Sequence, residues 1–393
     1  MTTSAEQIRA FEGPALLSYG FRPFFLFGAI WAAIAVALWL PMLSGHLMLP
    51  TAFSPIAWHM HELVYGYVPA IVAGFLMTAV PNWTGRLPVV GTPLLVLVLI
   101  WIAGRTAVLV SLWIGATAAA VIDLAFLAAL AFVVTREIVA AGNLRNLKLV
   151  VVVALLLLGN ALFHLEAIAG IGSGHGHRLG IAATVLLISI IGGRIVPSFT
   201  RNWLARRGPG RPPAPFDRFD AVVIATTGVA LASWVIDAYA VTTAFLALLA
   251  GTLNIARLGR WAGERTAAEP LVLILHVAFA FVPLGFLLLA LGILAPAVVA
   301  PSGAVHGWTA GAIGLMTLAV MTRASLGHTG RPLTATWAIQ LIYVLALIAA
   351  LARIVAAFGV LRDPMLHLSA TAWVFAFAGF VVVYAPLLVR RGA

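Results

Sequence analysis

Twelve long apolar runs dominate this chain of 393 residues, and each is long enough to cross a membrane as a helix. A helix needs about 20 mostly apolar residues to span the hydrocarbon core of a bilayer. With 63% hydrophobic and 9% charged residues, the chain carries more apolar surface than a soluble fold could bury. Spans are predicted near residues 24–43, 58–80, 92–110, 113–134, 148–171, 178–200, 219–237, 239–256, 270–293, 304–323, 333–356 and 369–389. The sequence therefore predicts an all-α, polytopic membrane protein.

Positive charge is distributed unevenly between the two sides of this predicted topology. With an inside N-terminus, all but four of the 23 Lys and Arg residues fall in inside segments. The exceptions are Arg105, Arg178, Arg353 and Arg362. This bias follows the positive-inside rule and predicts that both termini are cytoplasmic. The net charge of +11 thus reflects topology, and no nucleic-acid partner is expected because no basic run is interleaved with exposed aromatic residues.

The chain is predicted to be one integral-membrane domain, residues 1–393. Residues 1–22 are polar and lack an apolar core, so a cleavable signal peptide is not expected. The longest break between spans, residues 201–220, is rich in Arg and Pro. It is predicted to be a cytoplasmic hinge loop that can also bind anionic lipid. The chain has no cysteine, which excludes disulfides, iron–sulfur clusters and covalently attached haem.

A histidine followed 23 residues later by a threonine recurs three times at the start of apolar runs. The pairs are His61 with Thr84, His177 with Thr200, and His306 with Thr329. They open spans two, six and ten, which all run from outside to inside. The spacing predicts three parallel four-helix pseudo-repeats, with the three histidines at one depth of the bilayer.

Several histidines lie within apolar helices or at their ends, where imidazole is costly unless it has a partner. Neutral imidazole is a common ligand of metals and haem. The candidate metal ligands are His61, His306, His59, His164, His276 and His328. The alternative for each is a hydrogen-bonded side chain that joins two helices.

His59 and His61 cannot readily bind one metal together, because residues two apart on a helix point to nearly opposite sides. His61 shares its face with Tyr65 and other apolar residues, a wall against which a flat macrocycle could lie. Periodicity leaves either histidine possible as a ligand, and the repeat register favours His61.

Three further polar residues lie near the predicted layer of histidines. Asn160 lies four residues before His164 on one helix, so its amide could orient that imidazole. Arg105 and Arg178 lie at outer helix ends, where they could bind haem propionates or simply extend to the interface. Asp123 is interpreted as a single carboxylate with a capping or interfacial role.

Four sequence blocks closely resemble the NnrS family: WHMHELVYGY, GFLMTAVPNWTG, GGRIVPSFTRNW and GAIGLMTLAVMTRASLGHTGR. The resemblance covers nearly the whole chain. It implies a bacterial inner-membrane protein with twelve helices that carries haem, of b type here, and copper. It also implies a role in relieving nitric oxide and nitrosative stress, with an unknown electron donor and no settled reaction.

A looser resemblance links the chain to the catalytic subunit of haem–copper oxidases and nitric oxide reductases. That subunit holds a low-spin haem by histidines on its second and tenth helices, places that His61 and His306 match. The chain departs from that pattern because it has no adjacent His-His pair, so an oxidase-type binuclear centre is not expected.

These observations lead to a specific hypothesis, in which His61 and His306 bind one haem iron from opposite sides. A second site for nitric oxide would then use His59, His164 or His177 on the outer side, or His276 on the inner side. Two other classes stay open: a transporter whose histidines bind a passing ion, and a haem-based sensor without catalysis.

Overall fold

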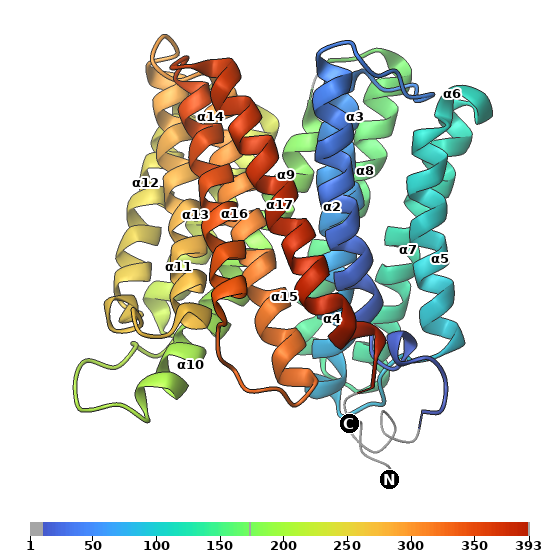
Figure 1. Ribbon diagram of the computed structural model, residues 1–393. Helices are drawn as coiled ribbons and strands as arrows, with labels where there is room; N and C mark the ends of the chain where they lie inside the picture. Colours follow the sequence, from blue (N-terminus) through green and yellow to red (C-terminus); the bar gives the residue numbers. More distant parts are fainter. Residues whose placement is uncertain (1–10, 173, 392–393) are drawn as a thin grey trace. The chain divides into compact units, whose positions relative to one another are not determined.

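The computed structural model describes residues 11–172 and 174–391, and these residues form helices without any strand (Figure 1). Twelve helical segments in this part of the chain are long and apolar enough to cross a membrane, which confirms the predicted number. They are Phe21–Leu43, Pro55–Thr84, Thr92–Leu109, Ala116–Ala140, Leu144–Ala169, His175–Leu204, Arg218–Ile236, Val241–Gly259, Pro270–Leu294, Pro301–His328, Trp337–Ala357 and Arg362–Val389. The chain is thus a multi-pass membrane protein.

The chain divides into two compact units, each of which is considered by itself. Unit 1 comprises residues 1–183 and 380–393, and unit 2 comprises residues 184–379. The boundary lies inside the sixth span, so residues 201–220 belong wholly to unit 2 and their predicted role as a hinge stays a prediction. Residues 1–10, part of the segment expected to contain no signal peptide, are outside the described residues.

Unit 1 is built on five spans that pack mainly against their neighbours in the chain. They are α2 (Phe21–Leu43), the segment α3 (Pro55–His61), η2 (Glu62–Tyr67) and α4 (Val68–Thr84), α5 (Thr92–Leu109), α7 (Ala116–Ala140) and α8 (Leu147–Ala169). Helix α7 contacts α4, α5 and α8, which gives it a central place in the unit. Polar residues on α7 therefore have partners on several sides.

Local sequence explains where the second and fifth spans begin and end. The Ser54 side chain accepts a hydrogen bond from the backbone N–H of Ala57, and Pro55 occupies the first turn. Both are favourable at a helix start, where backbone N–H groups lack partners. Gly85 and Gly170 follow α4 and α8 in the left-handed conformation, which glycine adopts without steric cost. These signals fix how far each span reaches.

Unit 2 contains the other seven spans, apart from the first turns of the sixth and the last turns of the twelfth. Its helices are α9 (His175–Leu187, shared with unit 1), α10 (Gly193–Leu204), α11 (Arg218–Ile236), α12 (Val241–Gly259), α13 (Pro270–Leu294), α14 (Pro301–His306), α15 (Gly314–His328), α16 (Trp337–Ala357) and α17 (Arg362–Val389). Helix α13 contacts α12, α14 and α15. It therefore packs against three other helices of this unit.

The three spans that open with the repeated histidines all contain a π-helical segment. Segment η2 (Glu62–Tyr67) follows His61 directly, and η6 (Gly307–Ile313) follows His306 directly. In the sixth span, which contains the second copy, η4 (Ile188–Gly192) begins eleven residues after His177. The first and third copies thus share a backbone feature in one register, while the second copy differs. The complete three-repeat arrangement stays a prediction.

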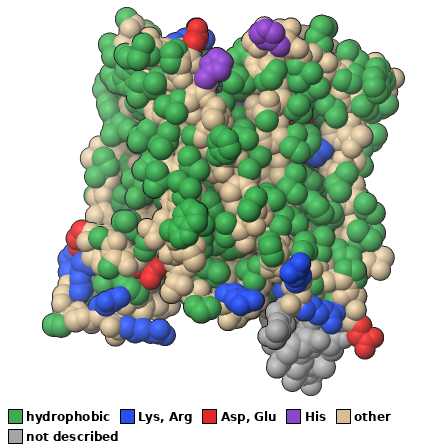
Figure 2. Space-filling model, in the orientation of Figure 1, with side chains coloured by type: hydrophobic (Ala, Val, Ile, Leu, Met, Phe, Trp, Pro, Cys, Tyr) green, Lys and Arg blue, Asp and Glu red, His purple; other side chains and the backbone are tan. Residues whose placement is uncertain are grey.

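On the face drawn in Figure 2 most side chains are hydrophobic, and most of the Lys and Arg side chains lie near the bottom of the view. Large apolar side chains such as Val121, Phe132 and Leu165 are more than 60% exposed. In water this exposure would be unfavourable. In a bilayer these side chains face lipid. The informative observation in this protein is therefore a polar side chain that is buried, not an apolar side chain that is exposed.

Candidate metal centre

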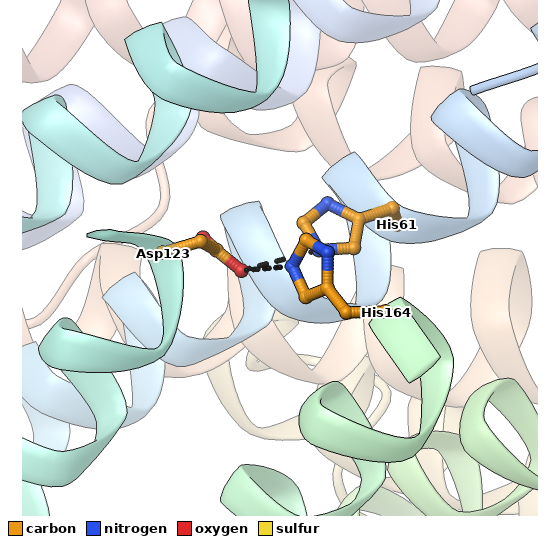
Figure 3. A group of neighbouring side chains, drawn as sticks. All are labelled: His61, Asp123 and His164. Carbon is orange, nitrogen blue, oxygen red and sulfur yellow. Dashed lines mark hydrogen bonds and ion pairs between the residues drawn. The ribbon is translucent and has the colours of Figure 1, made fainter. Parts of the chain in front are cut away.

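Three buried side chains from three different spans of unit 1 converge at one point (Figure 3). His61 ends α3, Asp123 lies in the third turn of α7, and His164 lies near the end of α8. Their exposed fractions are 0%, 2% and 3%. Within the described residues, they form the one group of three or more His, Asp or Glu side chains whose potential ligand atoms lie within 4.8 Å of one another.

One oxygen of Asp123 joins the two imidazoles. Atom Oδ2 of Asp123 lies 3.0 Å from Nε2 of His164 and 3.2 Å from Nε2 of His61. Ligand atoms bound to one ion at about 2.0–2.2 Å lie about 2.8–3.6 Å apart in octahedral or tetrahedral geometry. These two spacings therefore match a shared ion without a large rearrangement.

The other ring nitrogen of His61 faces the side chain of the next residue. Atom Nδ1 of His61 lies 2.9 Å from Oε1 of Glu62, which is fully buried as well. Histidines that bind metals commonly donate their second ring N–H to a carboxylate, which fixes the ring and strengthens the ligand. If Nδ1 donates to Glu62, then Nε2 of His61 keeps its lone pair for a cation.

Asn160 lies beside His61 rather than beside His164. Its Oδ1 lies 3.0 Å from Nε2 of His61, and its Nδ2 donates to Oδ2 of Asp123 at 2.7 Å. The expectation that this amide orients His164 is therefore wrong, although the two residues share a helix face. The reason is that Asp123 lies between them and accepts from both. Asn160 thus adds an oxygen next to the nitrogen of His61 that faces the cluster.

Arg105 balances part of the negative charge of the cluster. Its Nη1 donates to Oε2 of Glu62 at 2.8 Å, and its Nη2 donates to Oδ1 of Asp123. The guanidinium is 4% exposed, so the predicted roles at a helix end, propionate binding or extension to the interface, do not describe this arrangement. With both imidazoles neutral, two carboxylates and one guanidinium leave one excess negative charge. A buried excess charge is costly, and a bound cation would compensate it.

The donor set of the cluster indicates the class of ion. Two imidazoles and one carboxylate suit divalent zinc, copper, iron or nickel, whereas calcium and magnesium prefer oxygen ligands alone. Within the whole sequence no cysteine is available. Three protein ligands leave at least one coordination position for an outside molecule, as in catalytic rather than structural metal sites.

Aromatic rings enclose the imidazoles on the sides that carry no polar group. The rings of Phe53, Phe163 and Tyr65 lie 5.2, 5.3 and 5.7 Å from that of His61, measured between centroids. Of these rings only Tyr65 belongs to the predicted apolar wall, and the carboxylates of Glu62 and Asp123 add a polar side that was not expected. Both nitrogens of His61 face oxygens about 3 Å away. In this arrangement the residues round His61 could hold a single ion, and haem binding at His61 stays a prediction.

The other candidates of unit 1 lie apart from this cluster. His59 stacks on Trp39 with 4.0 Å between ring centroids, so it points away from His61, as the two-residue spacing predicts. His177 and Arg178 lie half-buried in the first turn of α9. Glu166 accepts hydrogen bonds from the backbone N–H groups of His175 and Gly176 there, so it caps the start of this helix.

The candidates of unit 2 do not gather into a similar group among the described residues. Atom Nδ1 of His306 lies 2.6 Å from the carbonyl oxygen of Ser302 in its own helix. Atom Nε2 of His276 lies 2.8 Å from the hydroxyl of Thr200. His328 is exposed at the end of α15. Because His61 and His306 belong to different units, their shared haem stays a prediction.

Sequence reasoning missed Asp123 as a member of the centre. It was interpreted as a capping or interfacial carboxylate, yet it is 2% exposed and contacts His61, His164, Asn160 and Arg105. A usable signal was present: an acid between long apolar stretches needs a nearby partner in a membrane. What the sequence could not supply is which spans lie against α7.

Comparison with known proteins agrees with the resemblance seen in the sequence blocks. A search among curated proteins returned no match. The family model described as "NnrS protein" matches residues 15–391, which includes all five spans of unit 1 and all the residues of the candidate centre. The chain therefore belongs to the NnrS family.

Proposed function

We propose that the protein is a membrane metalloprotein of the nitric oxide stress response, with a metal ion held by His61, His164 and Asp123. Membership of the NnrS family supports the connection to nitric oxide. The observation that carries the metal site is the convergence of two imidazoles and one carboxylate, all less than 4% exposed. Nitric oxide or a related small molecule would bind at the open position of the ion.

Copper is the ion that we propose for this site. Among divalent first-row metals, copper has the highest general affinity for nitrogen and oxygen ligands. Imidazole-rich sites without thiolate suit its oxidised form. Glu62 would hold His61 in the ligating orientation, and Arg105 would hold Asp123. A b-type haem held by other histidines is a separate expectation from the family resemblance, and it does not enter this proposal.

The location of the site follows if the positive-inside topology is correct. His61 lies near the start of the second span and His164 near the end of the fifth. Both are then in the outer half of a bacterial inner membrane, with the termini in the cytoplasm. The electron donor and any reaction are separate questions from binding at this centre.

The experiment is to purify the full chain without chelator and measure bound metal by mass spectrometry. Wild-type protein should retain about one ion per chain, the number that a single three-ligand centre holds, and nitric oxide should alter the electron paramagnetic resonance signal of that ion. His164→Ala should lose the ion. His59→Ala is the matched control because it removes a histidine two residues from His61, and it should retain the ion. Equal metal content in all three proteins would reject the site.

A transporter is the second candidate, and one observation favours it. Glu62 and Asp123 place two carboxylates beside His61. An ion pathway through a transporter is expected to be lined by carboxylates in this way. Both carboxylates nevertheless form ion pairs with the buried Arg105. This arrangement fits a fixed binding site better than a pathway along which an ion moves. Metal uptake into proteoliposomes that depends on the protein and is lost in Asp123→Asn would favour transport.

A further inference from the structure

A small cavity lies in unit 1 directly beside the candidate metal centre. Its volume is about 30 Å³, and His164 forms part of its wall. That volume is enough for one small molecule, because a cavity needs roughly 10–15 Å³ to hold a water molecule. The cavity lies between the metal centre and the end of unit 1 where α3 begins and α8 ends. It is thus next to a candidate ligand and near the protein surface.

Most of the lining of the cavity is apolar, and a smaller part of it is polar. Phe53, Ala116 and Ile168 contribute to it, and among the lining side chains only those of His164 and Ser111 carry polar atoms. An ion would lose its hydration in such a place without compensation, which is costly. An uncharged diatomic molecule loses little hydration free energy there. Ile168 is 47% exposed, so the lining reaches from the buried imidazole to the outside of α8.

The side chain of Phe53 lines the cavity and also contacts the imidazoles of the candidate metal centre. Its ring lies 5.2 Å from that of His61 and 5.6 Å from that of His164, measured between centroids. It comes from the segment before α3 and is only half-buried. His164 already forms part of the cavity wall, so a rotation of this one ring would change access from the cavity to the imidazole of His61.

Ser111 forms hydrogen bonds that hold the segment containing Phe53 in place. Its hydroxyl accepts a hydrogen bond from the backbone N–H of Ala52 at 2.8 Å and donates to the carbonyl of Val108 at 2.9 Å. The backbone N–H of Leu112 donates to the carbonyl of Pro50 at 3.1 Å. The polar groups at this end of unit 1 therefore position the segment that carries Phe53.

We propose that this cavity is the entry chamber through which a small uncharged molecule reaches the metal centre, with Phe53 as its inner gate. This inference rests on the proposed function for the identity of the site that the chamber serves. It adds the route and the class of ligand: an apolar molecule of diatomic size, not an anion. Nitric oxide has these properties.

Two substitutions should change entry in opposite directions. Ala116→Phe fills the chamber and should slow the association of nitric oxide with the metal-loaded protein several-fold. Phe53→Ala removes the gate and should accelerate it. Ala118→Phe is the matched control, because Ala118 is an exposed residue on the same turn of α7 and does not line the cavity. All three should retain the metal. Equal association rates in wild type and Ala116→Phe would overturn the proposal.

A second measurement tests the chamber without a metal. Crystals of the protein pressurised with xenon, an apolar probe, should show xenon between Phe53 and Ala116 in wild type and in Ala118→Phe. Ala116→Phe should show none there. Absence of xenon from the wild-type site would overturn the chamber even if metal binds at His61. Xenon in the site of a protein that binds no metal would support the chamber while rejecting the proposed function.

Discussion

His61 and His164 lie against the same carboxylate oxygen, Oδ2 of Asp123, although they come from spans about a hundred residues apart in the sequence. Glu62 and Arg105 complete the group by contacting His61 and Asp123 from the opposite sides. All five side chains are less than 5% exposed. Such a group is stable in a membrane only when its charges are balanced, and this requirement makes its response to substitution predictable.

Asp123→Ala should have the largest effect on both stability and metal content. It removes the oxygen shared by the two imidazoles and leaves Arg105 with one carboxylate instead of two. Breaking a buried charge pair by removal of one partner typically costs about 3–5 kcal/mol. Thermal unfolding followed by tryptophan fluorescence measures the loss of stability. A midpoint equal to that of wild type would contradict the described ion pairs.

Glu62→Gln should weaken metal binding without abolishing it. The substitution keeps the shape of the side chain but removes the charge that faces Nδ1 of His61. Loss of such an orienting partner typically lowers metal affinity by about 10–100-fold. A competition titration with a chelator of known affinity measures this change. An affinity as low as that of His164→Ala would show that Glu62 is itself a ligand.

Histidine substitutions separate the metal centre from the haem hypothesis. If one haem were shared by His61 and His306, changing either to alanine should abolish the same low-spin absorption and give the same spectrum. The candidate centre instead predicts that His61→Ala and His164→Ala lose the ion while His306→Ala keeps it. Absorption spectra and metal analysis of the three variants decide between these patterns.

Unit 2 contains a polar group that resembles this centre but lacks its ligands. Arg257 is fully buried, donates to Asp220 at 2.8 Å, and donates to the carbonyl of Ser189 in η4 at 2.9 Å. Arg105 likewise pairs with an aspartate and contacts η2 through Glu62. In both cases an arginine docks on a π-helical segment.

Arg257→Met should therefore lower stability without changing metal content. The expected cost is again about 3–5 kcal/mol, because Asp220 would stay buried without its main partner. Arg105→Met should lower both stability and metal affinity. Metal analysis of the two variants after purification provides the comparison, and loss of the ion from Arg257→Met would contradict a purely structural role.

Asp217 provides a pH-dependent test outside the membrane spans. Hydrogen bonds from Arg260 lower the pKa of this carboxyl from 3.8 to about 2. Because the folded-state pKa is depressed, the contribution to stability is fully present above pH 3.8 and is lost as pH falls towards 2. The unfolding midpoint of wild type should exceed that of Asp217→Asn near neutral pH. The difference should disappear at the acidic end, and a difference that grows there would contradict the pairing.

The sequence predicted the fold well because the bilayer imposes simple rules on it. Span number follows from hydropathy and length, and the candidate ligands His61 and His164 follow from the cost of imidazole in an apolar helix. Their pairing with Asp123 did not follow, because it depends on α7 packing between α4 and α8. The π-helical turn after His61 was also invisible, since no residue type specifies that extra backbone residue.

The metal content of His164→Ala, measured beside wild type and His59→Ala, tests the central claim most directly. His164 contributes one ligand and lies on α8, far in sequence from the His61 segment that first drew attention. The account predicts an ion in wild type and in His59→Ala, and its loss from His164→Ala with the protein still folded. An ion retained at the wild-type level in folded His164→Ala would contradict it.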